Sequence, residues 1–71
     1  MATEVNAPMV GKILNVVASV GDRVEEDETI IVMEAMKMEI EIVAPEAGVL
    51  SEVRVTAGDA VDPDTVVAVI D

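Results

Sequence analysis

Hydrophobic and polar residues alternate along several short stretches of this chain, as they do in half-buried β-strands. The clearest case is residues 38–42, where three apolar side chains share one face and two glutamates share the other. This stretch therefore predicts a strand with one face in the core. The apolar face consists of Met38, Ile40 and Ile42, and the polar face of Glu39 and Glu41.

Other stretches fit the same architecture. Residues 49–56 also alternate, and the apolar runs 30–34 and 66–70 each follow an acidic loop. Gly-Asp pairs, at Gly21 and again at Gly58, mark turns between the predicted strands. In the alternating stretch, Val49, Ser51, Val53 and Val55 are predicted on one face, and Leu50, Glu52, Arg54 and Thr56 on the other.

The sequence contains an internal repeat, which appears when it is shifted against itself by 37 positions without a gap. The copies are residues 1–34 and 38–71, and residues 35–37 join them in one predicted domain, 1–71. Glycines and aspartates carry most weight, because a valine-rich chain aligns Val with Val by chance. The matches include Ala7 with Ala44, Pro8 with Pro45, Gly11 with Gly48, Gly21 with Gly58, Asp22 with Asp59, and Asp27 with Asp64.

The joint between the copies contains Lys37, which belongs to neither copy. If the copies pack about a pseudo-two-fold axis, this joint corresponds to the gap between residues 71 and 1 at the other end of the molecule. The repeat therefore predicts that Lys37 lies at a tip, with the chain termini at the opposite end. A hairpin turn here lacks the usual glycine or asparagine, so we expect a strained backbone at Met36 or Lys37.

The composition favours β-structure, because the chain has fifteen Val and six Ile but only two Leu and no aromatic residue. Each copy provides about four short strands. Eight antiparallel strands in two four-stranded sheets would bury the aliphatic set between them. We therefore predict an all-β flattened barrel or sandwich with internal pseudo-two-fold symmetry.

The formal net charge is −11, with only four basic residues. Nucleic acid is therefore a poor partner, because phosphate binding requires clustered Lys and Arg. The apolar runs are far shorter than the roughly 18 residues of a membrane-spanning helix, so we expect no direct membrane insertion. These features predict a soluble, cytoplasmic protein, and a monomer as an isolated domain.

The chain has no histidine and no cysteine, which excludes an imidazole base, a thiolate nucleophile and an ordinary zinc site. The carboxylates alternate along strands in polar company, which is typical of a solvated face. We therefore predict no catalytic residue and no metal site, and we interpret Lys37 as a group presented to other proteins. An acyl carrier would need a serine at a helix start, and neither Ser19 nor Ser51 has that context.

The hexapeptide Glu34-Ala35-Met36-Lys37-Met38-Glu39 resembles the attachment motif of biotinyl domains, the biotin carboxyl carrier modules. The resemblance extends over essentially the whole chain, through both Ala-Pro pairs and both Gly-Asp turns. It implies the same two-sheet fold, with the modified lysine on an exposed hairpin. An extra loop found between early strands of some carriers is absent, because the copies align without a gap.

By this resemblance, a biotin protein ligase would link biotin to Lys37 through an amide. Glu34, Ala35, Met36 and Met38 would complete the motif read by the ligase and by partner enzymes. The domain would carry carboxybiotin between a biotin carboxylase and a carboxyltransferase or decarboxylase. Because Met38 also lies on the apolar face of its predicted strand, packing in the core and recognition both stay open for it.

Two alternatives share the fold. Lipoyl domains also present a lysine, but usually within Asp-Lys-Ala, whereas methionines flank Lys37 here. The flanking residues therefore favour biotin over lipoate. The other alternative is a structural module of the same fold, which would carry neither group.

Overall fold

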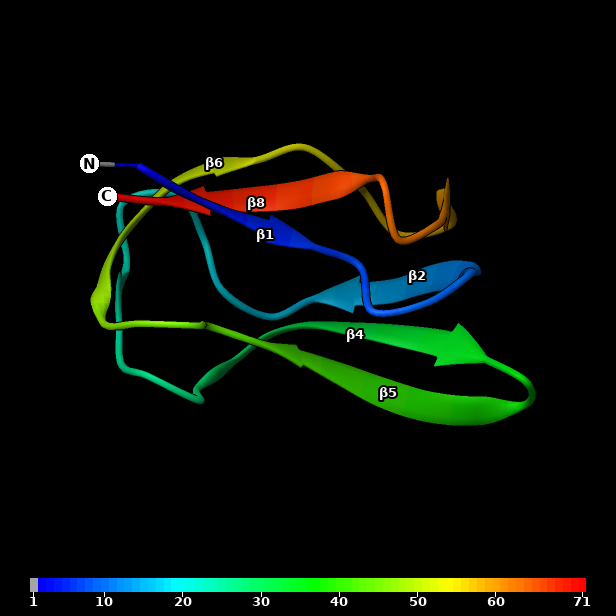
Figure 1. The fold of residues 1–71 in the computed structure, drawn as a ribbon. Coiled ribbons are helices and arrows are strands. Elements are labelled where there is room, and N and C mark those ends of the chain that lie inside the picture. The colour runs from blue at the N-terminus through cyan, green and yellow to red at the C-terminus, as the bar shows by residue number, and fades with distance from the viewer. Residues whose placement is uncertain (1) are drawn as a thin grey trace.

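A computed structural model describes residues 2–71 and contains eight strands in two four-stranded antiparallel sheets (Figure 1). The predicted fold class is therefore confirmed. The strands are β1 (Thr3–Asn6), β2 (Gly11–Val16), β3 (Arg23–Val24), β4 (Thr29–Ala35), β5 (Met38–Val43), β6 (Gly48–Val53), β7 (Ala60–Val61) and β8 (Val66–Ile70).

The internal repeat determines which strands form each sheet. One sheet has the order β1-β8-β6-β3 and the other has the order β5-β4-β2-β7. The 37-residue offset turns β1 into β5, β8 into β4, β6 into β2 and β3 into β7, so it converts one order into the other. Each sheet takes strands from both copies, and neither copy could form its sheet alone.

The Gly-Asp turns have the same structure in both copies. Gly21 has a φ of 96°, a left-handed conformation that glycine adopts without a steric penalty. The carboxylate of Asp22 accepts a hydrogen bond from the backbone N–H of Ser19 at 2.9 Å. In the second copy, Gly58 has a φ of 98°, and Asp59 accepts the same bond from Thr56 at 2.9 Å.

The predicted facing of the first residues of β6 is wrong. Leu50 is buried at 1% exposure, whereas Val49 is 42% exposed. The pairing of β6 with β8 shifts between Leu50 and Glu52, as at a β-bulge, and this shift reverses the alternation. Val53 and Val55 then face the core as predicted. Strand β2 has the equivalent irregularity between Ile13 and Asn15.

The core lies between the sheets and is entirely aliphatic apart from one methionine, Met33. No polar or charged side chain is buried in residues 2–71. The close packing of aliphatic side chains is therefore the main source of stability. The largest fully buried side chains are Ile13, Ile30, Ile31, Met33, Leu50, Ile70, Val24 and Val67.

The molecule measures 32 × 19 × 17 Å, and the β4–β5 hairpin and the chain ends lie at opposite ends of its long axis (Figure 1). Thr3 pairs with Ile70, so the first and last strands run side by side there. This arrangement confirms the prediction that the termini lie opposite Lys37. Within residues 2–71, no helix is long and apolar enough to cross a membrane.

Candidate functional site

Lys37 lies in the two-residue turn of the β4–β5 hairpin. Ala35 pairs with Met38, and the two residues between them have φ values of 53° at Met36 and 64° at Lys37. Two consecutive residues of positive φ are characteristic of a type I′ turn, which matches the right-handed twist of the flanking strands. The expected backbone strain is confirmed, and it affects both residues.

We predict that Met36→Asn raises the free energy of unfolding by about 1 kcal/mol, because asparagine tolerates the left-handed conformation better than methionine. Met36 is 86% exposed and contributes little packing that the change could remove. Urea denaturation measures the difference. The matched control is Met38→Asn, which removes another exposed methionine from an extended strand and should not stabilise the protein. If Met36→Asn is less stable than the unaltered protein, the inference that the backbone is strained at Met36 is wrong.

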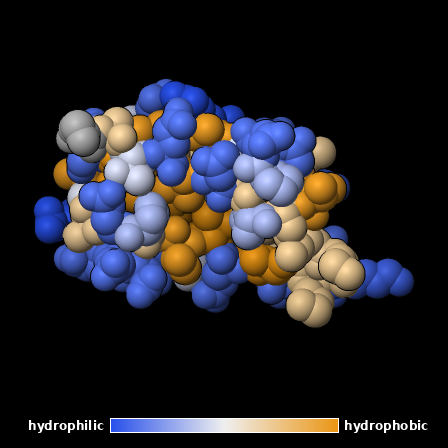
Figure 2. All heavy atoms as spheres, viewed as in Figure 1, coloured by the Kyte–Doolittle hydropathy of each residue, from blue (hydrophilic) through white to orange (hydrophobic). Residues whose placement is uncertain are grey.

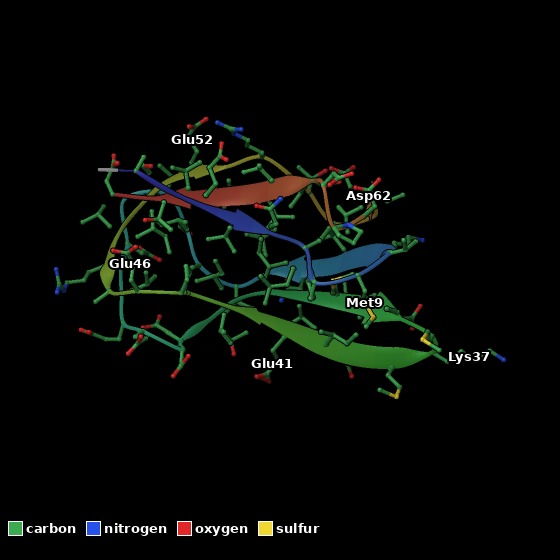
Figure 3. The ribbon with its side chains drawn as sticks, in the orientation of Figure 1. Met9, Lys37, Glu41, Glu46, Glu52 and Asp62 are labelled. Atoms are coloured by element: carbon green, nitrogen blue, oxygen red, sulfur yellow. The ribbon has the colours of Figure 1, made fainter. Side chains whose placement is uncertain are left out.

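The side chain of Lys37 extends into solvent beyond the end of both sheets (Figure 3). Neither ion pair among the described residues includes it. These pairs join Arg23 to Glu25 and Arg54 to Glu52. The hydrogen bond and charge of Glu52 raise the pKa of the Arg54 guanidinium above its ordinary value, with a smaller contribution from Glu4. Lys37 thus offers an unencumbered amine.

The remaining motif residues support the turn from the strands. Ala35 is 4% exposed and faces the core at the base of the turn. Glu34 is exposed on the outer face, in register with Lys12 on one side and Glu39 on the other. These residues hold the hairpin in the sheet, while the Lys37 side chain is exposed and has no ion pair within residues 2–71.

The structure answers the open question about Met38. Its side chain is 62% exposed, although it lies on the same strand face as the buried Ile42. The hairpin extends past the opposite sheet, so no strand of that sheet lies over the apolar face of β5 near the turn (Figure 1). Ile40, which lies between Met38 and Ile42 on this face, is partly buried. Core packing is therefore the wrong interpretation of Met38.

The sequence did not single out two apolar residues that the structure places beside this hairpin. Met9 is 36% exposed and Val10 is 71% exposed, and they precede Gly11 at the start of β2. The backbone at Gly11 packs directly on Ala35, where an added Cβ would lie 3.1 Å from the Ala35 Cβ. A comparison of the two copies at these positions would have drawn attention to them.

The structure also has a shallow groove of about 290 Å³ between the edge strands β1 and β5. Its lining is symmetric about the repeat and includes Glu4 with Glu41 and Val5 with Ile42. In Figure 2 the apolar floor is visible between hydrophilic margins. The groove does not include the hairpin turn, so it offers no pocket for the lysine.

Chemically, this site can present a primary amine but cannot activate it, because no group able to act as a base contacts Lys37 among the described residues. An exposed amine on a projecting turn can form an amide with an activated carboxylic acid. The substrate-binding groups would come from other proteins. Presentation of an attached group is therefore the chemistry that this geometry supports.

Known proteins resemble this chain in sequence and in structure. A family described as biotin-requiring enzymes matches residues 3–70. The chain is 54% identical over 41 residues to the gamma subunit of methylmalonyl-CoA decarboxylase from Veillonella parvula, covering 58% of this chain and 32% of that subunit. It is 52% identical over 42 residues to the biotin carboxyl carrier protein of Streptococcus mutans, covering 59% of this chain and 32% of that protein.

This chain therefore spans about a third of the length of these curated relatives. Among solved structures, the urea carboxylase of Kluyveromyces lactis matches it with a TM-score of 0.95 and 34% identity, covering 100% of this chain and 6% of that enzyme. The family match and this structural match both extend through all eight strands.

Proposed function

This chain belongs to the biotin–lipoyl family of biotin-requiring enzymes, and from that premise we propose that Lys37 is the residue to which its biotin is attached. The observation that carries the proposal is the position of Lys37 in the left-handed turn of a hairpin that extends past the opposite sheet. A modifying enzyme can enclose such a turn without unfolding the domain. Lys12, by contrast, lies within a strand, paired with Glu34 and Ala60.

When attached, biotin supplies a ring that accepts and releases a carboxyl group, and the protein supplies its position. The role of this chain is mechanical. The two sheets pack around one aliphatic core, and the exposed side chain of Lys37 carries the attached group away from this compact body. Tethering gives that group an effective concentration of roughly millimolar order near each partner site when the linker spans the distance.

The whole assembly in this proposal contains a biotin protein ligase, a site that loads the carboxyl group and a site that unloads it. The loading and unloading sites belong to a biotin carboxylase and to a carboxyltransferase or decarboxylase. Two relatives support this class of assembly. One is the gamma subunit of a methylmalonyl-CoA decarboxylase, and the other is a biotin carboxyl carrier protein. Because the carrier must leave each site, we expect small, transient interfaces with each partner.

A lipoyl carrier is the competing proposal, because lipoyl domains share this fold. The flanking residues distinguish the two, since Met36 and Met38 stand on either side of Lys37 where lipoyl domains usually have Asp and Ala. One of the relatives named above is a biotin carboxyl carrier protein, and the family that matches this chain is described as biotin-requiring enzymes. Both observations support biotin.

We predict that the chain, co-expressed with a biotin protein ligase, gains the mass of one biotin and binds streptavidin. Intact-protein mass spectrometry gives the number of groups, and peptide mapping gives the residue. The matched arm is co-expression with a lipoyl ligase and lipoate, which should leave the mass unchanged. Attachment of lipoate in place of biotin would favour the lipoyl carrier. If neither group is attached, the structural module is the remaining alternative.

A further inference from the structure

Four exposed apolar residues gather at the lysine end of the molecule. Met36 is 86% exposed and Met38 is 62% exposed. Met9 is 36% exposed and Val10 is 71% exposed. Figure 3 places Met9 on the same side as Lys37, and Figure 2 shows hydrophobic atoms grouped beside the projecting hydrophilic tip. We call these four residues the methionine rim.

The rim has two parts, and close packing at Gly11 brings them together. Gly11 joins the Met9–Val10 loop to the hairpin, because its backbone contacts the backbone of Glu34 and the side chain of Ala35. An added Cβ at Gly11 would also lie 2.5 Å from the terminal methyl of Met33. Strand β2 can therefore approach β4 this closely only with glycine here, and this packing places the loop beside the turn.

The internal repeat shows which side chains the fold needs in the Met9–Val10 loop, because the second copy contains the equivalent loop with different residues. Met9 aligns with Glu46, and Val10 aligns with Ala47. The two loops have the same pattern of burial, with a buried alanine followed by three exposed residues. Figure 3 shows Glu46 at the end of the molecule opposite Lys37. The fold thus accepts a carboxylate and a small residue in this loop, and folding does not require Met9 or Val10.

Water-exposed methionine and valine without a folding role indicate a surface that another protein covers. Methionine suits a surface with several partners, because its unbranched, polarisable side chain adapts to different apolar contours. A carrier whose lysine must enter more than one site has that requirement. The rim surrounds the one part of this chain that has to reach a partner's active site.

We propose that the methionine rim is the docking surface for the loading enzyme, and that Met9 and Val10 form half of it. This inference rests on the proposed function, and it adds a binding role to two residues outside the attachment motif. The surface that receives the rim is an apolar collar around the entrance of a biotin carboxylase, through which the side chain of Lys37 passes. Its non-acidic character follows from the net charge of −11 on the carrier.

Methyl-labelled methionine provides a direct test by NMR. The unmodified domain is titrated with a biotin carboxylase subunit, chosen because it carboxylates the biotinylated form of the unaltered domain. We expect the methyl signals of Met9, Met36 and Met38 to shift or broaden together. The methyl of Met33 is 0% exposed and cannot touch the partner, so its signal should shift less than those of the three exposed methionines. A methyl signal of Met9 that stays in place when the carboxylase binds would overturn the proposal.

The double variant Met9→Gln/Val10→Ala should bind the carboxylase more weakly and raise the dissociation constant about tenfold, which corresponds to about 1.4 kcal/mol. Its matched control is Val20→Ala/Val49→Gln, which removes two exposed valines near the chain ends. The repeat tolerates both control changes, since Ala57 and Lys12 occupy the equivalent positions. The control should bind as the unaltered domain does, and both variants should unfold at an unchanged temperature.

These outcomes separate the two proposals. If the double variant gains biotin on Lys37 normally and binds the carboxylase with an unchanged dissociation constant, the docking surface is wrong and the attachment site stands. If mass spectrometry finds no biotin on the unaltered chain, the attachment site is wrong. Equal weakening in the double variant and in the control would show a general loss of hydrophobic contact, which would also overturn the assignment of the rim.

Discussion

Lys37→Arg is expected to abolish biotin attachment completely while leaving the fold and stability unchanged. Amide formation requires a neutral amine that can attack an activated carboxyl group, and the guanidinium of arginine stays protonated. The positive charge at the turn is retained. Because the side chain is exposed, the free energy of unfolding should change by less than about 0.5 kcal/mol.

Two measurements check this prediction on the chain co-expressed with a biotin protein ligase. Intact mass and streptavidin binding report the attachment, and urea denaturation reports the stability. The matched control is Lys12→Arg, which alters the other lysine of the chain and should retain full biotinylation. A biotin adduct on Lys37→Arg would refute the attachment site, and loss of the adduct from Lys12→Arg would move the site to β2.

Ile30→Ala is expected to lower the free energy of unfolding by about 2–5 kcal/mol, enough to unfold a large fraction of a domain this small. Ile30 is 1% exposed, and no aromatic residue is present to fill the space it would leave. Its carbonyl also accepts hydrogen bonds from the N–H groups of Val17 and Ala18, so relaxation around the cavity is restricted. Urea denaturation followed by far-ultraviolet circular dichroism measures the loss.

The matched control for this variant is Val20→Ala, which removes methyl groups from a side chain that is 61% exposed. Its stability should stay within about 0.5 kcal/mol of the unaltered protein. An equally small loss for Ile30→Ala would mean that the aliphatic core is not the main source of stability. The paired measurement therefore tests the account of the fold independently of biotin.

The repeat made the architecture predictable to an unusual degree. The matched glycines, such as Gly11 with Gly48, defined two equivalent halves, and the Val-rich composition required β-structure. From these features followed two four-stranded sheets, with Lys37 at one end and the termini at the other. Symmetry also predicted a hairpin turn at residues 35–38, where local turn chemistry gave no support.

Local alternation was less reliable than symmetry. It assigned Val49 to the core, because a single inserted residue at a bulge reverses the facing of a strand and leaves no mark in a pattern of period two. It also gave Met38 an apolar face without showing that the opposite sheet stops short of the turn. Met9 was overlooked for a similar reason, since its proximity to the hairpin depends on the pairing of β2 with β4.

The amino-acid sequence by itself determined the β-class, the two equivalent halves, the position of the turns and the choice of a single lysine between the halves. These properties depend on side-chain type and on spacing along the chain, and both can be read directly from the sequence. Only the tertiary structure decided which side chains are covered, because coverage depends on where the opposite sheet ends and where a bulge occurs. That is why exposure at Met38, and the gathering of Met9 and Val10 around Lys37, became visible only in the folded molecule.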